Sequence, residues 1–301
     1  MTGQPRLGIT LPIAEELITS GDFIRDYARQ AESVGVESVW VSEHVVIAAS
    51  YEPLYPFAAD GLMPVDPSVI VQPDPLDLLS FVAAATTKLK LGTAMMVAPL
   101  HSPALLAKRA ASVDRLSGGR LLLGLAVGWH REEFWALGRS YERRGAQLEE
   151  CIQAMRALWS ECPASYAGEF VSYDSLYCLP SPSGGKVPIV LGGEGERTLR
   201  RVARLADGWF PYGLSPRDFA DRAAVLRAEL AKAGRSPDEV ELTAWPGSYD
   251  PDGDLDAALV GDYVRAGATR IVISPAISEA AELSSVIRRL KAYQEDVLQK
   301  V

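Results

Sequence analysis

Residues 114–138 read DRLSGGRLLLGLAVGWHREEFWALG, and this segment predicts a helix end, a turn and a buried strand in succession. Gly118-Gly119 predicts the end of a helix, because glycine adopts the positive φ angle at which helices commonly stop. The run from Leu121 to Val127 has no polar alternation, which indicates a strand buried on both faces. Such strands are typical of parallel sheets in α/β proteins. Gly128-Trp129 then marks the carboxyl end of the strand, where these folds place their sites.

Strand-length apolar segments recur along the whole chain, and helical stretches separate them. The predicted strands are Leu7 to Leu11, Ser38 to Val41, Leu89 to Val97, Leu121 to Val127, Ile189 to Leu191, Gly208 to Phe210, Val240 to Thr243 and Arg270 to Ile273. Eight alternations without a linker predict an α/β protein with one TIM (β/α)8 barrel domain over residues 1–301. A doubly wound open sheet is the alternative, because periodicity does not reveal closure.

Two connections are longer than the few residues usual in such folds. The first, Val45 to Pro73, follows the second strand and carries Tyr51, Tyr55, Phe57 and Met63 among its five prolines. It is interpreted as a lid over the barrel, or else as a flap that only seals the core. The second, Glu161 to Val187, precedes the fifth strand, and its sequence YAGEFVSY predicts a small hairpin over a barrel end.

Composition excludes several classes of function. The 301 residues include 30 Lys and Arg against 39 Asp and Glu, so a formal net charge of −9 argues against nucleic-acid binding. No apolar run approaches the roughly 18 residues of a membrane span. The three cysteines have neither a disulfide framework nor metal-ligand spacing, which favours a reducing compartment. We therefore expect a cytoplasmic protein with a small-molecule substrate and no membrane partner.

The strand ends carry the candidate chemistry. His44 leaves the second strand where an imidazole could bond a cofactor or pass a proton, although Glu43 or the backbone could equally satisfy it. Gly192-Gly193 follows the fifth strand and precedes a helix start. This arrangement is typical of a phosphate-binding site and also of a tight turn. Glu194 and Glu196 would compete with a phosphate there unless they turn outward.

Three aromatic residues, Trp129, Tyr212 and Trp245, stand at further strand ends and would converge above a closed barrel. Aromatic walls suit a planar cofactor or an apolar substrate, and simple capping of the barrel is the other interpretation. The remaining histidines, His101 and His130, are expected to be solvated beside helix starts. None of the histidines shares a metal-ligand spacing with another, so we expect no metal site.

These residues resemble the luciferase-like monooxygenase superfamily of flavin and deazaflavin enzymes. The resemblance runs from about Arg6 to Pro275. It is most specific in Leu91 to Gly138 and in Pro188 to Pro211, with VWVSEH at Val39 to His44 as weaker support. The GWHREEF form looks like the branch that uses coenzyme F-420, a deazaflavin that carries only hydrides.

The resemblance implies a ring-shaped cofactor at the carboxyl mouth of the barrel. His44 would face the ring as the catalytic residue, and Ala94-Met95 would form a bulge behind the ring, often with a non-proline cis peptide. Val127-Gly128 would pack beside the ring, and Gly192-Gly193 would take the cofactor phosphate.

One position departs from the superfamily pattern. Where its sugar-phosphate dehydrogenases carry a proton-supplying glutamate, this chain has Trp129. Glu132 and Glu133 lie one helical turn later. Without loop movement, we expect them to be poor substitutes for that glutamate as proton donors. The resemblance thus favours hydride transfer to or from an apolar or conjugated molecule. The alternative functions are an FMN-dependent monooxygenase and a flavin-binding protein without turnover. A homodimer is possible, but no residue identifies an interface.

Overall fold

Eight parallel strands form a closed barrel, as the sequence predicts. The computed structural model describes residues 4–246 and 257–300. Each barrel strand pairs in parallel with the next, and the pairings of β3 with β5 and of β11 with β1 close the ring. The barrel strands are β1 (Arg6–Thr10), β2 (Ser38–Val41), β3 (Lys90–Thr93), β5 (Leu121–Ala126), β8 (Ile189–Leu191), β9 (Gly208–Trp209), β10 (Glu241–Ala244) and β11 (Arg270–Ile273). The open-sheet alternative is therefore excluded.

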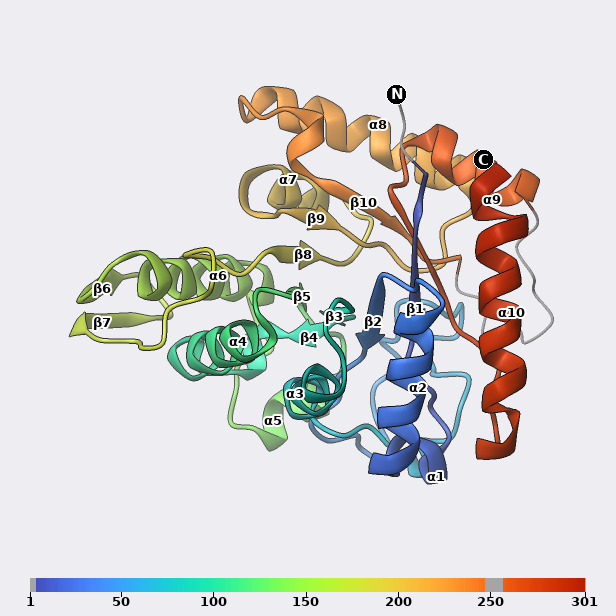
Figure 1. Cartoon of the computed structure of the whole chain (residues 1–301). Coiled ribbons are helices and arrows are strands. Elements are labelled where there is room, and N and C mark those ends of the chain that lie inside the picture. The colour runs from blue at the N-terminus through green and yellow to red at the C-terminus, as the bar shows by residue number, and fades with distance from the viewer. Residues whose placement is uncertain (1–3, 247–256, 301) are drawn as a thin grey trace.

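Helices surround the barrel and complete the α/β architecture (Figure 1). They are α1 (Glu15–Ile18), α2 (Gly21–Ser33), α3 (Pro75–Ala85), α4 (Pro103–Ser117), α5 (Arg131–Ala136), α6 (Arg144–Ser160), α7 (Glu196–Leu205), α8 (Pro216–Lys232), α9 (Ala257–Ala266) and α10 (Leu283–Asp296). The last helix, α10, packs beside α2 (Figure 1). Within the described residues, no helix has the length and apolar character needed to span a membrane.

The stretch 114–138 folds as its sequence predicts. Gly118 ends α4 in the left-handed region with a φ of 73°, and β5 follows with every residue but the last buried. Between them, the buried Arg120 donates hydrogen bonds to the carbonyls of Ala83, Thr86 and Leu89. One side chain thus satisfies the carbonyls that α3 leaves free at its end and ties α3 to the barrel.

Trp40 fills the barrel interior. It is 1% exposed and packs with Leu122, Val190, Phe210 and Val272 from other strands or strand ends. Glycines on both neighbouring strands make room for it, because a Cβ at position 92 would overlap the indole and one at position 8 would lie 2.9 Å from its Nε1. The barrel is consequently a packed core rather than a pore.

The two long connections behave differently. Residues 45–73, which include the short 3-10 helix η1 (Pro67–Val69), cover the mouth of the barrel. The second connection forms the predicted hairpin from β6 (Ala164–Ala167) and β7 (Ser172–Leu176). However, its predicted position over a barrel end is wrong: it lies along the outer flank of α6 (Figure 1), where Tyr173 donates to the carbonyl of Ala154. No residue of 161–187 borders the mouth cavity, so this hairpin is a flap.

Candidate active site

A cavity of about 590 Å³ opens at the carboxyl ends of the barrel strands. It is bordered by all ten residues singled out from the sequence as a site, namely His44, Ala94, Met95, Val127, Gly128, Trp129, Gly192, Gly193, Tyr212 and Trp245. Residues separated by up to two hundred positions therefore meet at one place. Its size lies within the range of cavities that hold small molecules and cofactors.

The cavity floor includes an interruption of the third barrel strand. The Ala94-Met95 peptide is cis, as the resemblance implies, and the strand resumes as β4 (Met96–Val97). Before the interruption, the Thr93 hydroxyl accepts from the Gly124 N–H and donates to the Gly124 carbonyl, both at 2.8 Å. After it, the Val97 N–H donates to Glu43 at 2.7 Å. The bulge is thus held at both ends by side chains.

Gly192-Gly193 borders the side of the cavity next to α7. Gly193 has a φ of 96°, which favours glycine, and Gly195 at the N-cap offers no side chain to satisfy the free N–H groups of α7. The predicted competition from acidic residues does not arise, because Glu194 and Glu196 are exposed and lie outside the cavity lining. Free N–H groups and the positive end of the helix dipole leave this corner suited to an anion.

Sequence reasoning missed two further residues of this corner, Thr198 and Arg201, which border the cavity from the first and second turns of α7. Arg201 is 8% exposed and its Nε bonds Glu149 at 3.1 Å. Gly145 accommodates the guanidinium, because a Cβ there would lie 2.6 Å from Nη2. The sequence of α7 is that of an ordinary amphipathic helix, and Arg201 stands out only because the structure buries its charged side chain.

His44 stands across the cavity and is bound by a carboxylate from α5. Its Nδ1 lies 3.1 Å from Glu133 Oε2, and the Glu133 side chain is only 1% exposed. Glu133 borders the cavity, so the expectation that it could reach the site only after loop movement is wrong. Its carboxylate is engaged by His44 and by the N–H groups of residues 45 and 46, because the start of the segment 45–73 folds back onto α5.

The expectation that His101 and His130 are solvated is also wrong. His130 is 0% exposed, and its Nε2 accepts a hydrogen bond from the Ala48 N–H at 3.0 Å. Burial lowers the pKa of His130. His101 is largely covered as well, and its Nε2 bonds the buried carboxylate of Glu43 at 2.9 Å. His130 thus anchors the backbone at Ala48, and His101 holds the Glu43 carboxylate that accepts the N–H of Val97.

Four consecutive residues of the GWHREEF motif hold the start of the segment 45–73. His130 binds Ala48, and Arg131 forms an ion pair with Glu52 at 2.8 Å. The backbone N–H of Glu52 donates to Glu132, and the N–H groups of residues 45 and 46 donate to Glu133. The motif therefore fixes the base of the segment over the cavity, which favours the lid interpretation over a simple flap.

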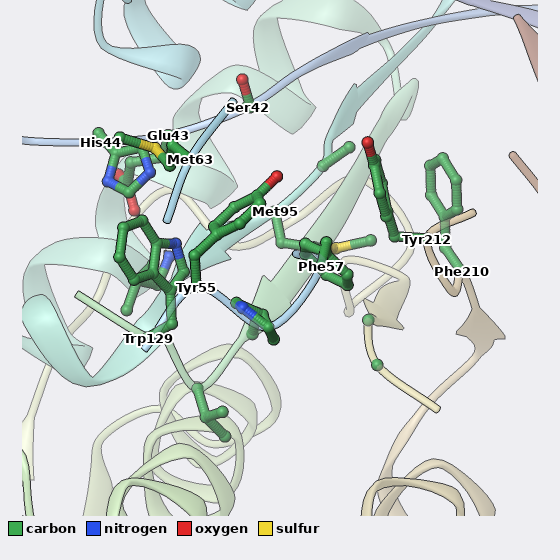
Figure 2. A pocket seen from close by; sticks show the side chains of 18 of the residues that line it. Ser42, Glu43, His44, Tyr55, Phe57, Met63, Met95, Trp129, Phe210 and Tyr212 are labelled. Atoms are coloured by element: carbon green, nitrogen blue, oxygen red, sulfur yellow. Dashed lines mark hydrogen bonds between the residues drawn. The ribbon is translucent and has the colours of Figure 1, made fainter. Parts of the chain in front are cut away.

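Aromatic side chains form a continuous wall (Figure 2), and Trp129, Tyr212 and Trp245 converge as predicted. Tyr55 and Phe57 from the lid segment bridge the two sides, with ring-centroid distances of 5.2 Å from Tyr55 to Trp129 and 4.3 Å from Phe57 to Tyr212. Tyr212 in turn meets Trp245 at 4.8 Å. Burial raises the pKa of Tyr55 to about 12, so its hydroxyl stays neutral. The wall can hold a planar or apolar molecule.

Known proteins share this architecture. The model of a family described as luciferase-like monooxygenase matches residues 6–248. An uncharacterized protein of Mycobacterium tuberculosis is 32% identical over 270 residues, which cover 88% of this chain and 91% of the relative.

Among solved structures, the coenzyme F-420-dependent tetrahydromethanopterin reductase of Methanopyrus kandleri aligns with a TM-score of 0.73 and 16% identity over 99% of both chains. The FMN-bound oxygenating constituent of 3,6-diketocamphane monooxygenase from Pseudomonas putida aligns with a TM-score of 0.74 and 16% identity, again over 99% of both chains. At 16% identity, both similarities show a shared fold and nothing beyond it.

Proposed function

The chain belongs to the luciferase-like monooxygenase family, and on that premise we propose that it is a deazaflavin-dependent oxidoreductase. It would transfer a hydride between coenzyme F-420 and an apolar or conjugated small molecule. The observation that carries the proposal is the single cavity that brings the predicted phosphate corner, bulge, histidine and aromatic wall together. The choice of deazaflavin rests on the GWHREEF form of residues 128–134.

The residues present fit such a cofactor. Gly192-Gly193 and the N-terminus of α7 would hold the phosphate, with Arg201 adding a positive charge nearby. The Ala94-Met95 bulge and Val127-Gly128 would support the ring. Gly128 suits that place because it has a φ of 78° and a Cβ there would lie 2.5 Å from a side-chain carbon of Val97. When bound, the deazaflavin supplies or accepts the hydride.

The protein's own part would be positioning, water exclusion and the accompanying proton. A hydride exchanged with a neutral carbonyl or alcohol has to be matched by one proton, which the His44 imidazole can accept or donate. Trp129 has no titratable group to do so. The lid residues Tyr55 and Phe57 would keep water from the substrate side of the cavity.

Two titrations followed by fluorescence test the cofactor, one with coenzyme F-420 and one with FMN. The proposal expects tight deazaflavin binding, and a reduced complex that survives in air, since reduced flavin is rapidly reoxidised and reduced deazaflavin is not. Tight FMN binding without deazaflavin binding would make the protein an FMN-dependent monooxygenase instead. Bound deazaflavin that is never oxidised or reduced by a panel of enones, quinones and alcohols would indicate a binding protein without turnover.

A His44→Ala variant tests the predicted catalytic residue. We expect the folded protein and most of its cofactor affinity to persist, because other residues form the phosphate corner and the bulge, while turnover falls. His101→Ala is a matched control, since that imidazole binds Glu43 and does not border the cavity. Unchanged turnover in His44→Ala would remove His44 from the reaction.

A further inference from the structure

We infer that Glu133 is the positioning residue of His44: it holds the imidazole in the tautomer protonated at Nδ1, so that Nε2 is left as a proton acceptor at the cavity. The catalytic consequence rests on the proposed function, whereas the tautomer itself does not. The inference starts from the contact of 3.1 Å between His44 Nδ1 and Glu133 Oε2.

The groups that contact the Glu133 carboxylate are hydrogen-bond donors. Its side chain is 1% exposed, and its Oε1 accepts the N–H groups of Val45 at 2.6 Å and Val46 at 3.3 Å. Among the described residues, His44 is the only ion-pair partner within 4 Å. A carboxylate oxygen only accepts hydrogen bonds when ionised, so the facing nitrogen of His44 has to carry a hydrogen.

The other ring nitrogen of His44 has a different environment. No hydrogen bond from another described residue reaches Nε2, although the ring borders the cavity. Trp129 packs edge-on against the imidazole at 5.7 Å and His130 at 6.0 Å, which restricts rotation of the ring. Because Nδ1 holds the hydrogen, Nε2 presents a lone pair that can take a proton from a bound substrate or return one.

The two oxygens of one carboxylate therefore have separate tasks. Oε2 orients the imidazole, and Oε1 fixes the first residues of the lid segment. The other charged and titratable groups nearby are engaged elsewhere: Glu132 accepts from the N–H of residue 52, and Glu43 binds Val97 and His101. Orientation of His44 and closure of the cavity are thus linked through Glu133.

The tautomer can be read without cofactor or substrate. In protein labelled with ¹⁵N-histidine, long-range ¹H–¹⁵N spectra separate protonated from unprotonated ring nitrogens, and the three histidines of the chain keep the spectrum simple. His44→Gln identifies the His44 signals. At about pH 8, where an ordinary imidazole is neutral, we expect His44 of the wild type to be protonated at Nδ1. Protonation at Nε2 would overturn the inference, and the tautomer is read in the wild-type protein, with His44→Gln used only to assign the signals.

Glu133→Gln then tests the cause. The new amide oxygen can still accept from Val45, but its NH2 group would face Nδ1, so the hydrogen of His44 should move to Nε2. Glu132→Gln is the matched control, because that neighbouring carboxylate anchors the same segment without touching His44. It should leave the His44 tautomer unchanged.

Turnover of the loaded enzyme gives the second result. We expect Glu133→Gln to lower kcat by about tenfold or more with KM changed only severalfold, because replacing the carboxylate that orients a catalytic histidine by an amide leaves the wrong tautomer. Equal losses in Glu133→Gln and Glu132→Gln, with the His44 tautomer unchanged in both, would mean that Glu133 acts only through the lid and would refute the inference. A protein without any turnover would refute the proposed function, while the tautomer would still decide the role of Glu133.

Discussion

Replacing Thr93 by valine should weaken the bulge beneath the cavity. Thr93 is 0% exposed, and its hydroxyl makes two hydrogen bonds of 2.8 Å, one to the N–H and one to the carbonyl of Gly124. Valine has nearly the same shape but no hydroxyl, so both backbone groups would lose their partner in a buried place. Each such loss costs about 1–3 kcal/mol. The sum, about 2–6 kcal/mol, is a large part of the 5–15 kcal/mol by which proteins of ordinary stability are folded.

Thr93→Ser is the matched control. It keeps the hydroxyl and removes one buried methyl group, which costs about 1 kcal/mol. Urea unfolding followed by circular dichroism should therefore rank the wild type, Thr93→Ser and Thr93→Val in order of falling stability, with unchanged slopes. Coenzyme F-420 affinity should follow the same order, since Ala94-Met95 follows directly. A valine variant that unfolds no earlier than the serine variant would show that the hydroxyl does not hold the bulge.

Three further predictions concern the rest of the site. Arg201→Gln should raise the Kd of the phosphate-bearing cofactor by about tenfold or more, as expected for a lost charge-assisted contact, and a Kd equal to that of the exposed control Arg200→Gln would exclude Arg201 from the phosphate corner. Phe57→Ala removes the contact of 4.3 Å with Tyr212 and should raise KM for an apolar substrate severalfold while the cofactor Kd is unchanged; a change in the cofactor Kd alone would place Phe57 elsewhere. Burial holds the pKa of His130 below its ordinary value of 6.5, so the unfolded chain binds the proton more readily: stability is complete above this pH and falls below it, by at most about 1.4 kcal/mol per pH unit. Urea unfolding at pH 7.5 and 5.5 should show this loss in the wild type and a smaller one in His130→Gln, and equal losses would contradict it.

Local signals were sufficient for the barrel and for one side of the site. An unbroken apolar run such as Leu121 to Val127 is compatible with little besides a buried strand, and the structure ends it only one residue earlier. Because the carboxyl ends of all barrel strands meet at one mouth, locating the strands also located most of the cavity. The places of His44 and Gly192-Gly193 follow from their positions at strand ends, whereas the place of Gly128 beside the cofactor is an implication of the family resemblance.

Features that depend on docking between distant segments were not predicted. His130 stands at a helix start, where side chains are usually exposed. It is buried because the segment around Ala48, 82 residues earlier, packs on it and donates a hydrogen bond to its ring. The partnership of His44 and Glu133 spans 89 residues and has no periodicity. The hairpin of residues 164–176 was predicted from its turn residues, but nothing local determines that it packs along α6.

The anchoring of residues 45–52 by the GWHREEF motif divides the mouth of the barrel into two modules. The base of the lid is bound to α5 through residues 130–133. In the described part of the chain, residues 53–71 make hydrogen bonds only within the segment 45–73, and they reach the rest of the cavity through side chains such as Phe57. The tip could therefore be exchanged for that of a relative without disturbing the histidine, the bulge or the phosphate corner. New substrate preferences could arise in this way while the redox chemistry beneath stayed constant.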